Sequence, residues 1–252
     1  RVPGVTSISA DIHKYGYAAK GASTITYRNL DYLRYQMFVY QDWPGGVFAS
    51  SALLGTRPGG AYAAAWGVLQ YFGKAGYRAL ARDTLEAVNR LKAGVEKIPE
   101  LEVMGNPQGP LFAYKSISPD LNIYAVGDQM DAMGWQVNRN QFPSGLHAMV
   151  TAQHLKVVDQ YLADLEKSVE TVKANPELAG QGGAATYGML AHVPLRGMVK
   201  RKVLEMYSEQ YRAGGGELDM AAESASPGAG KGPVDRVLAW WVARQTRRSS
   251  GG

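Results

Sequence analysis

Near its start the chain has two stretches whose hydrophobic and polar positions predict β-strands. Residues 5–11 are typical of a buried strand with polar ends, and residues 23–28 alternate and are rich in β-branched side chains. Residues 14–21 connect these strands, and residues 29–37 predict a short helical or irregular piece. Glycine and proline at residues 43–46 and 56–60 predict a loop region without regular structure.

Three longer segments carry apolar residues at the three- and four-residue spacing of an α-helix. Residues 61–73 are rich in alanine and predict a buried helix. Residues 77–95 show the clearest amphipathic pattern, which Pro99 closes, and their apolar stripe is expected to face the core rather than a partner. Residues 153–173 repeat this pattern up to Asn175 and Pro176.

Short elements fill the interval between the last two helices and follow the second one. Strands are predicted at residues 101–104, 111–114, 134–137 and 147–151, and a helix at 123–133 with Val126, Met130 and Met133 inward. A further helix is predicted at 194–211. Residues 213–233 contain mainly glycine, alanine and serine with scattered charges, too little apolar surface to order themselves. We therefore expect residues 213–252 to form a flexible or non-native tail.

Composition narrows the class of protein. The chain has 252 residues, of which 46% are hydrophobic and 19% charged, so it should be globular. Cysteine is absent, which excludes disulfides, thiolate metal sites and cysteine nucleophiles. The net charge of +5 owes much to four arginines near the end, so it does not indicate a nucleic-acid surface. No apolar run approaches the roughly 20 residues of a transmembrane helix, and a cytoplasmic location is expected.

The residues with the clearest chemical character lie in the loop after the first strand. Lys14 stands among aromatic residues, beside His13 and near Lys20, a setting in which the pKa of an amine is often depressed. A neutral amine is what Schiff-base chemistry requires. A single lysine in a loop is, however, far more often a solvated surface charge, so its spacing alone leaves both interpretations open.

The order of several motifs carries a family resemblance. Residues 7–21, SISADIHKYGYAAKG, resemble the cofactor-lysine segment of the sphingosine-1-phosphate lyases, within the group II pyridoxal-phosphate-dependent decarboxylase superfamily. Later matches to that lyase branch are DW at 42–43 with GG at 45–46, GTRPGG at 55–60, GNP at 105–107, GW at 134–135, Asn138, QFP at 141–143 and YGM at 187–189. The resemblance covers residues 1 to about 211. One departure is Ala19, where the family usually has proline.

The resemblance implies the cofactor and its ligands. Lys14 would form a Schiff base with pyridoxal 5'-phosphate, and His13 would lie at the cofactor phosphate. Lys20 resembles a second active-site lysine that serves phosphate recognition or proton transfer. Gly55 and Thr56 resemble a loop that crosses a homodimer interface to the partner subunit's cofactor phosphate. No metal site is implied.

The same resemblance implies an α/β architecture, the C-terminal part of a fold-type I large domain followed by a small α+β domain. On this interpretation residues 1–76 are a remnant of the cofactor-binding large domain, and residues 77–212 are the C-terminal domain with its long linking helix. The upstream half of the family supplies the group that stacks on the cofactor ring, the carboxylate at the ring nitrogen and most of the phosphate cup. We therefore expect this chain by itself to be inactive.

The expected substrate is a phosphorylated sphingoid base with an amine at C2 and a hydroxyl at C3. Retro-aldol cleavage of its C2–C3 bond gives a fatty aldehyde and phosphoethanolamine. Two alternatives stay open: an amino-acid decarboxylase of the same superfamily, and a non-catalytic dimerisation or interaction module. The residues Tyr15 to Tyr17, with Lys20 and Gly21, favour the lyase over the decarboxylase.

Overall fold

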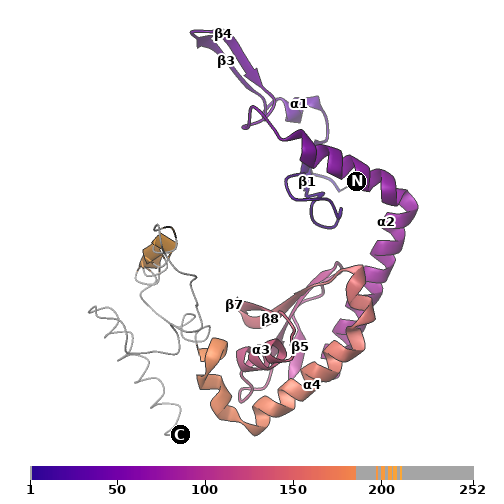
Figure 1. The fold of residues 1–252 in the computed structure, drawn as a ribbon, viewed down its shortest axis with the longest axis vertical. Coiled ribbons are helices and arrows are strands. Elements are labelled where there is room, and N and C mark those ends of the chain that lie inside the picture. Colours follow the sequence, from indigo (N-terminus) through magenta and orange to yellow (C-terminus); the bar gives the residue numbers. More distant parts are fainter. Residues whose placement is uncertain are drawn as a thin grey trace. The chain divides into compact units, whose positions relative to one another are not determined.

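The computed structural model describes residues 2–185 and the separate residues 197, 200, 201, 204, 205, 207, 208 and 211. Two compact units make up the chain, Arg1–Ala81 (unit 1) and Arg82–Gly252 (unit 2). Helix α2 (Gly59–Val95) runs from the first unit into the second (Figure 1). Most of the helix predicted at 194–211 and the whole tail from 213 lie outside the described residues. The predicted domain boundaries stay predictions.

Unit 1 begins with an antiparallel pair, β1 (Ser7–Ala10) and β2 (Thr24–Tyr27), which confirms both predicted strands. The pairing runs from Ser7 opposite Tyr27 to Ala10 opposite Thr24. The prediction that the first strand is buried is wrong, since all four of its residues are exposed. A two-stranded sheet covers little of its own surface, and β1 pairs with β2 alone. A short helix, α1 (Leu30–Leu33), follows.

The glycine-rich region contains regular structure that the sequence did not predict. Strands β3 (Phe38–Trp43) and β4 (Gly46–Ser50) form an antiparallel hairpin. Gly46, with a φ of 102°, allows the tight turn between them, because residues that carry a side chain rarely adopt that backbone conformation. The hairpin projects from the rest of unit 1, with the rings of Phe38 and Trp43 both against Phe48 (Figure 1). All six residues of β3 are exposed.

Helix α2 merges the two predicted helices at residues 61–73 and 77–95. Its backbone is non-helical at Gly73, where φ is 54° and ψ is −173°. The prediction of a buried first segment is wrong, since Trp66 is 67% exposed and Leu69 is 42% exposed. The second segment buries its predicted apolar stripe in part: Val88, Leu91 and Val95 are buried, whereas Ala81 and Leu85 are exposed. No helix in the described part of the chain is long and apolar enough to cross a membrane.

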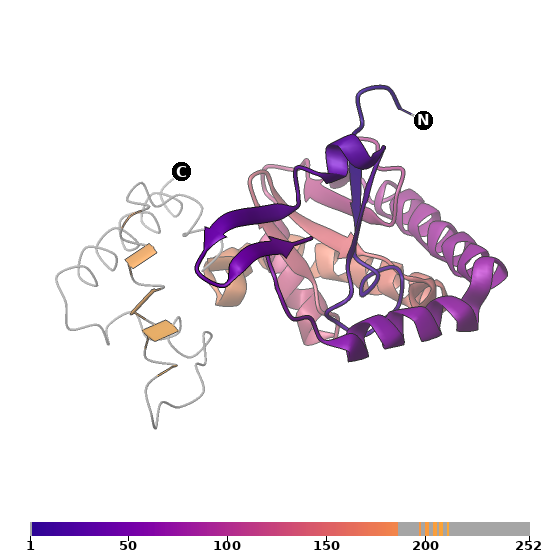
Figure 2. The same cartoon turned by 90° about the horizontal axis from the view of Figure 1, so that it is seen from above.

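Unit 2 contains a four-stranded antiparallel sheet of β5 (Leu101–Val103), β6 (Leu111–Ser116), β7 (Asn138–Gln141) and β8 (Ser144–Met149), in the order β5-β6-β8-β7. Alternate residues of β6, Phe112 and Tyr114, are buried, as the pleat of a half-covered sheet requires. Helix α3 (Ile123–Ala132) packs on β7 and β8 and lies beside α4 (Val158–Ala174) (Figures 1 and 2).

Several boundaries in unit 2 differ from their predicted places. Residues 134–137 form no strand; the strand begins at Asn138 instead. Helix α4 begins at Val158, after the 3-10 turn Ala152–Lys156, whereas the sequence placed its start at 153. Met133, predicted to face inward, is 36% exposed because it lies at the C-terminal cap of α3. The predicted end at Asn175 is confirmed, and the 3-10 turn Pro176–Gly180 follows.

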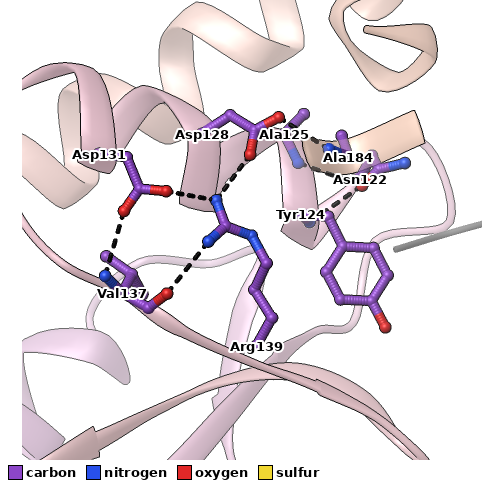
Figure 3. A network of polar contacts seen from close by, with 8 residues as sticks. All are labelled: Asn122, Tyr124, Ala125, Asp128, Asp131, Val137, Arg139 and Ala184. Atoms are coloured by element: carbon purple, nitrogen blue, oxygen red, sulfur yellow. Dashed lines mark hydrogen bonds and ion pairs between the residues drawn. The ribbon is translucent and has the colours of Figure 1, made fainter. Parts of the chain in front are cut away.

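A polar network joins α3 to β7 and to the chain that follows α4 (Figure 3). The guanidinium of Arg139 in β7 donates to Asp128 and Asp131 of α3, each at 2.6 Å. The other oxygen of the Asp128 carboxylate accepts the Ala184 N–H at 2.7 Å. The side chain of Arg139 is only 10% exposed, so these carboxylates balance a charge that is largely removed from water.

Candidate active site

Residues 11–23, called the lysine loop here, connect β1 to β2, and hydrogen bonds within their own backbone hold them in place. The Lys14 N–H donates to the Asp11 carbonyl at 3.0 Å, and the Tyr17 N–H donates to the Lys14 carbonyl at 2.9 Å. The His13 N–H reaches the Ala22 carbonyl at 3.2 Å, which closes the loop near its far end. Lys14 thus lies between two successive hydrogen-bonded turns, so its backbone position is well defined.

Aromatic packing fixes the loop against α2 within unit 1. The Tyr77 hydroxyl donates to the Gly16 carbonyl at 2.7 Å. The ring of Phe72 contacts both Tyr17 and Tyr77, with centroids 6.0 Å and 5.4 Å away. A side chain at position 16 would come within 2.5 Å of the Ile12 carbonyl oxygen, so the close approach of the chain to itself requires Gly16. Tyr17 itself adopts a left-handed φ of 59°.

The charged groups of the loop gather around Asp11. The Lys14 amine lies 2.7 Å from the Asp11 carboxylate, and the Ser23 hydroxyl donates to the same carboxylate at 2.5 Å. The hydrogen bonds from Lys14 and then Ser23 lower the pKa of Asp11 below its usual range. The Lys14 side chain is 67% exposed and reaches solvent.

The orientation of His13 follows from its partner. Its Nδ1 lies 2.8 Å from the Ala22 carbonyl oxygen, and because a carbonyl only accepts, Nδ1 must carry a proton. The other ring nitrogen, Nε2, is 4.0 Å from the Asp11 carboxylate. His13 therefore has one nitrogen committed to the loop backbone and one on the side of Asp11.

The remaining predicted residues lie apart from this cluster. Lys20 is exposed at the turn before Gly21, in the same loop as Lys14. Gly55 and Thr56 are exposed in the segment between β4 and α2, where the Arg57 guanidinium donates to the Leu54 carbonyl. The structure thus brings His13 and Lys14 together and places Gly55 and Thr56 in a separate segment of unit 1. The roles assigned to these residues stay predictions.

Sequence reasoning missed Asp11 as a member of this site. Its spacing of three residues from Lys14 was a usable signal, since residues i and i+3 meet across a single turn. The hydroxyl of Ser23 had no such signal, because it lies twelve residues along and reaches Asp11 only through the pairing of β1 with β2.

The residues of the lysine loop fit a phosphorylated aldehyde cofactor at its point of attachment. Lys14 offers a primary amine that is accessible and carried on a fixed backbone. His13 and Lys20 supply nitrogen groups in the same loop that are able to contact a phosphate. Lys14, His13 and Lys20 therefore have the chemical groups that such a cofactor would require, and their roles stay predictions.

Comparison of sequences shows close relatives. No family model matches the chain. It is 42% identical over 210 residues to sphingosine-1-phosphate lyase of Arabidopsis thaliana, a match that covers 83% of this chain and 38% of that protein. It is also 42% identical over 191 residues to sphingosine-1-phosphate lyase 1 of Rattus norvegicus, covering 75% of this chain and 33% of the relative. The chain thus spans little more than a third of these relatives.

Comparison with solved structures also finds a sphingosine-1-phosphate lyase. The chain is similar to the sphingosine-1-phosphate lyase of Burkholderia pseudomallei, with 41% identity and a TM-score of 0.65 over 69% of this chain and 40% of that one. The glutamate decarboxylase of Lactobacillus brevis aligns over 67% of this chain and 41% of that one, with a TM-score of 0.56 and 22% identity, which shows a shared fold alone. The predicted fold-type I relationship is confirmed at this level, over about two thirds of the chain.

Proposed function

We propose that this chain, a homologue of the sphingosine-1-phosphate lyases, contributes the lysine segment of a pyridoxal-phosphate-dependent carbon–carbon lyase. The observation that carries the proposal is the accessible amine of Lys14 on a loop fixed by hydrogen bonds, in a chain 42% identical to such a lyase. The substrate would be a phosphorylated long-chain base. Its C2–C3 bond breaks, the C3 hydroxyl loses its proton to become an aldehyde, and C2 gains a proton.

The chain's own residues have distinct tasks in this proposal. Lys14 supplies the amine to which the cofactor attaches, and the bound cofactor supplies a sink for the electrons of the broken bond. His13, held by the Ala22 carbonyl, keeps its ring in one orientation beside the loop. Lys20, exposed six residues beyond Lys14, is free to swing toward a phosphate or to move a proton.

A homodimer belongs to the same proposal. Gly55 and Thr56 would approach the partner subunit's cofactor phosphate through the exposed segment between β4 and α2. The hairpin of β3 and β4 and the first part of α2 carry exposed large apolar residues, among them Val47 at 71% and Trp66 at 67%. Exposed apolar surface of this kind is typical of a protein–protein interface, which supports the proposal that unit 1 contacts a second subunit.

The lyase is favoured over an amino-acid decarboxylase by the difference in similarity. Identity is 41% to the lyase structure and 22% to the decarboxylase, although both share the fold. The two activities differ in the bond that breaks, C2–C3 in the lyase and the bond to the carboxylate in the decarboxylase. Substrate therefore separates them directly.

Absorbance spectroscopy tests the proposal. Pyridoxal phosphate added to the chain should give an imine band, and Lys14→Ala should abolish it. Lys74→Ala, which removes another exposed lysine from unit 1, is the matched control and should keep the band. A band of equal size in the Lys14→Ala variant would contradict the assignment of Lys14.

The substrate class is tested on the loaded protein. A phosphorylated long-chain base should shift the imine band, because its amine replaces that of Lys14, whereas glutamate should leave the band unchanged. A shift with glutamate and none with the phosphorylated base would favour the decarboxylase.

A further inference from the structure

We propose that Asp11 is a positioning residue for Lys14, whose carboxylate holds the free amine beside the loop and slows its reaction until another group displaces the carboxylate. The inference rests on the proposed function, because the amine matters only if it is the cofactor's attachment point. It goes further by giving a task to a side chain outside the predicted site residues.

Asp11 is held where a counter-ion for Lys14 is needed. One carboxylate oxygen accepts the Ser23 hydroxyl at 2.5 Å and the other lies 2.7 Å from the Lys14 amine. Asp11 directly follows β1 and Ser23 directly precedes β2, next to the paired residues Ala10 and Thr24. The register of the two strands therefore fixes the position of the Asp11 carboxylate. The Asp11 side chain is 29% exposed.

The contact with Asp11 restricts the conformations of the Lys14 side chain. That side chain is 67% exposed, and a lysine in solvent samples many rotamers. The ion pair selects the rotamers that keep the amine beside the loop. Asp11 thus reduces the conformational freedom of the reactive group before any cofactor is attached.

The other titratable groups around this pair come from the same loop and from α2. His13 Nε2 is 4.0 Å from the Asp11 carboxylate, whose pKa is lowered mainly by the hydrogen bonds from Lys14 and Ser23. Burial, and then the neighbouring Tyr17, raise the pKa of Tyr15. The Tyr77 hydroxyl of α2 is engaged with the Gly16 carbonyl. Among these described groups Asp11 supplies the negative charge that faces Lys14.

The chemistry gives the sign of the effect. An ammonium group must release a proton to solvent before its nitrogen attacks an aldehyde carbon, and water leaves as the carbon–nitrogen double bond forms. A carboxylate beside the amine stabilises the charged form. Asp11 therefore restrains Lys14 until a competing group takes the place of the carboxylate, and it receives the ammonium when Lys14 is released.

Trace acetylation tests the pair without cofactor. The full chain is treated with an N-hydroxysuccinimide acetate ester between about pH 7 and about pH 11, and peptide mass spectrometry gives the rates at Lys14 and Lys20. At about pH 8, Lys14 should react about two- to fivefold faster in Asp11→Asn than in the unaltered chain, as expected for the loss of an exposed ion pair. The Lys20 rate should not change.

Two further variants define the effect. Asp31→Asn removes an exposed carboxylate elsewhere in unit 1 and should leave the Lys14 profile unchanged. Asp11→Glu keeps the charge and should restore most of the restraint. Equal Lys14 profiles in Asp11→Asn and the unaltered chain would overturn the inference.

Salt provides a test that needs no substitution, should Asp11→Asn fail to fold by circular dichroism. Raising NaCl from about 0.05 M to about 1 M screens exposed pairs, so the Lys14 rate should rise relative to that of Lys20. A constant ratio overturns the inference.

A shifted acetylation profile in a chain that forms no imine with pyridoxal phosphate supports the role of Asp11 and contradicts the proposed function. An imine whose formation has the same pH profile with and without Asp11 contradicts Asp11 alone.

Discussion

The guanidinium of Arg139 lies on the side of the sheet where the core residues of unit 2 gather. The register places Val103, Tyr114, Leu146 and Arg139 opposite one another across β5, β6, β8 and β7. Three of these residues are buried and apolar or aromatic, and the fourth is a charge. Asp128 and Asp131 of α3 make that charge tolerable (Figure 3). They also attach the polar strand β7 to the helix.

Replacing Arg139 should therefore destabilise unit 2. Arg139→Met leaves two carboxylates without their shared partner and should lower the free energy of unfolding by about 2–3 kcal/mol, since the carboxylates keep some solvent. Urea unfolding followed by circular dichroism measures the change. Arg90→Met is the control, because its ion pair with Asp159 is exposed and should contribute about 0–1 kcal/mol. Equal losses in the two variants would show that the network adds nothing beyond a surface pair.

Among the elements, the central strands of unit 2 depend on a close approach at Gly145 of β8. A Cβ at this position would lie 2.6 Å from the Tyr114 carbonyl oxygen of β6, and backbone cannot move aside as a flexible side chain would. Gly145→Ala should therefore cost about 1–3 kcal/mol of unfolding free energy, as overpacking does. Gly109→Ala, where a Cβ meets open space, should have little effect. Chemical denaturation of both variants decides between these outcomes, and an unchanged midpoint for Gly145→Ala would contradict the packing argument.

At the scale of the whole molecule, the exposed apolar surface of unit 1 is expected to cause the chain to self-associate. Unit 2 has a contiguous buried core, whereas the strands of unit 1 are almost entirely exposed and carry large apolar side chains, among them Val39, Trp43 and Val47. The full chain should therefore self-associate in sedimentation velocity experiments at micromolar concentration. Trp66→Glu should raise the monomer fraction, because it places a charge in an exposed apolar stripe. Gln70→Glu adds the same charge to the same helix without removing an apolar group and should not. A stable monomer of the unaltered chain would contradict this prediction.

The candidate site was predictable where local chemistry decides it. The loop between two strands, with Lys14 and His13 near its start, follows from β-branched residues on either side of glycine and aromatic residues. The ion pair with Asp11 depends on a turn, and the contact between Asp11 and Ser23 depends on the pairing of β1 with β2. The pattern of neighbouring residues does not specify that β1 pairs with β2.

The fold shows the same division at β7. Trp135 and Val137 led to the strand prediction at residues 134–137, whereas the strand that forms at residues 138–141 has the polar sequence NRNQ. Its inward residue is Arg139, and only the carboxylates of α3 make that position acceptable. A rule that expects apolar residues on an inward face could not have found it.

The segments that form the long helices, the end of α4 at Asn175 and the family resemblance that the comparisons support could all be read from the amino-acid sequence. These features rest on short-range periodicity, capping and residue identity, which the chain carries locally. Which apolar faces are covered, and which charged groups form ion pairs, depends on the packing of segments that lie far apart in the sequence. Trp66 and Leu69 are exposed although their spacing predicts burial, because burial depends on whether another element packs against that face, and periodicity does not contain that information.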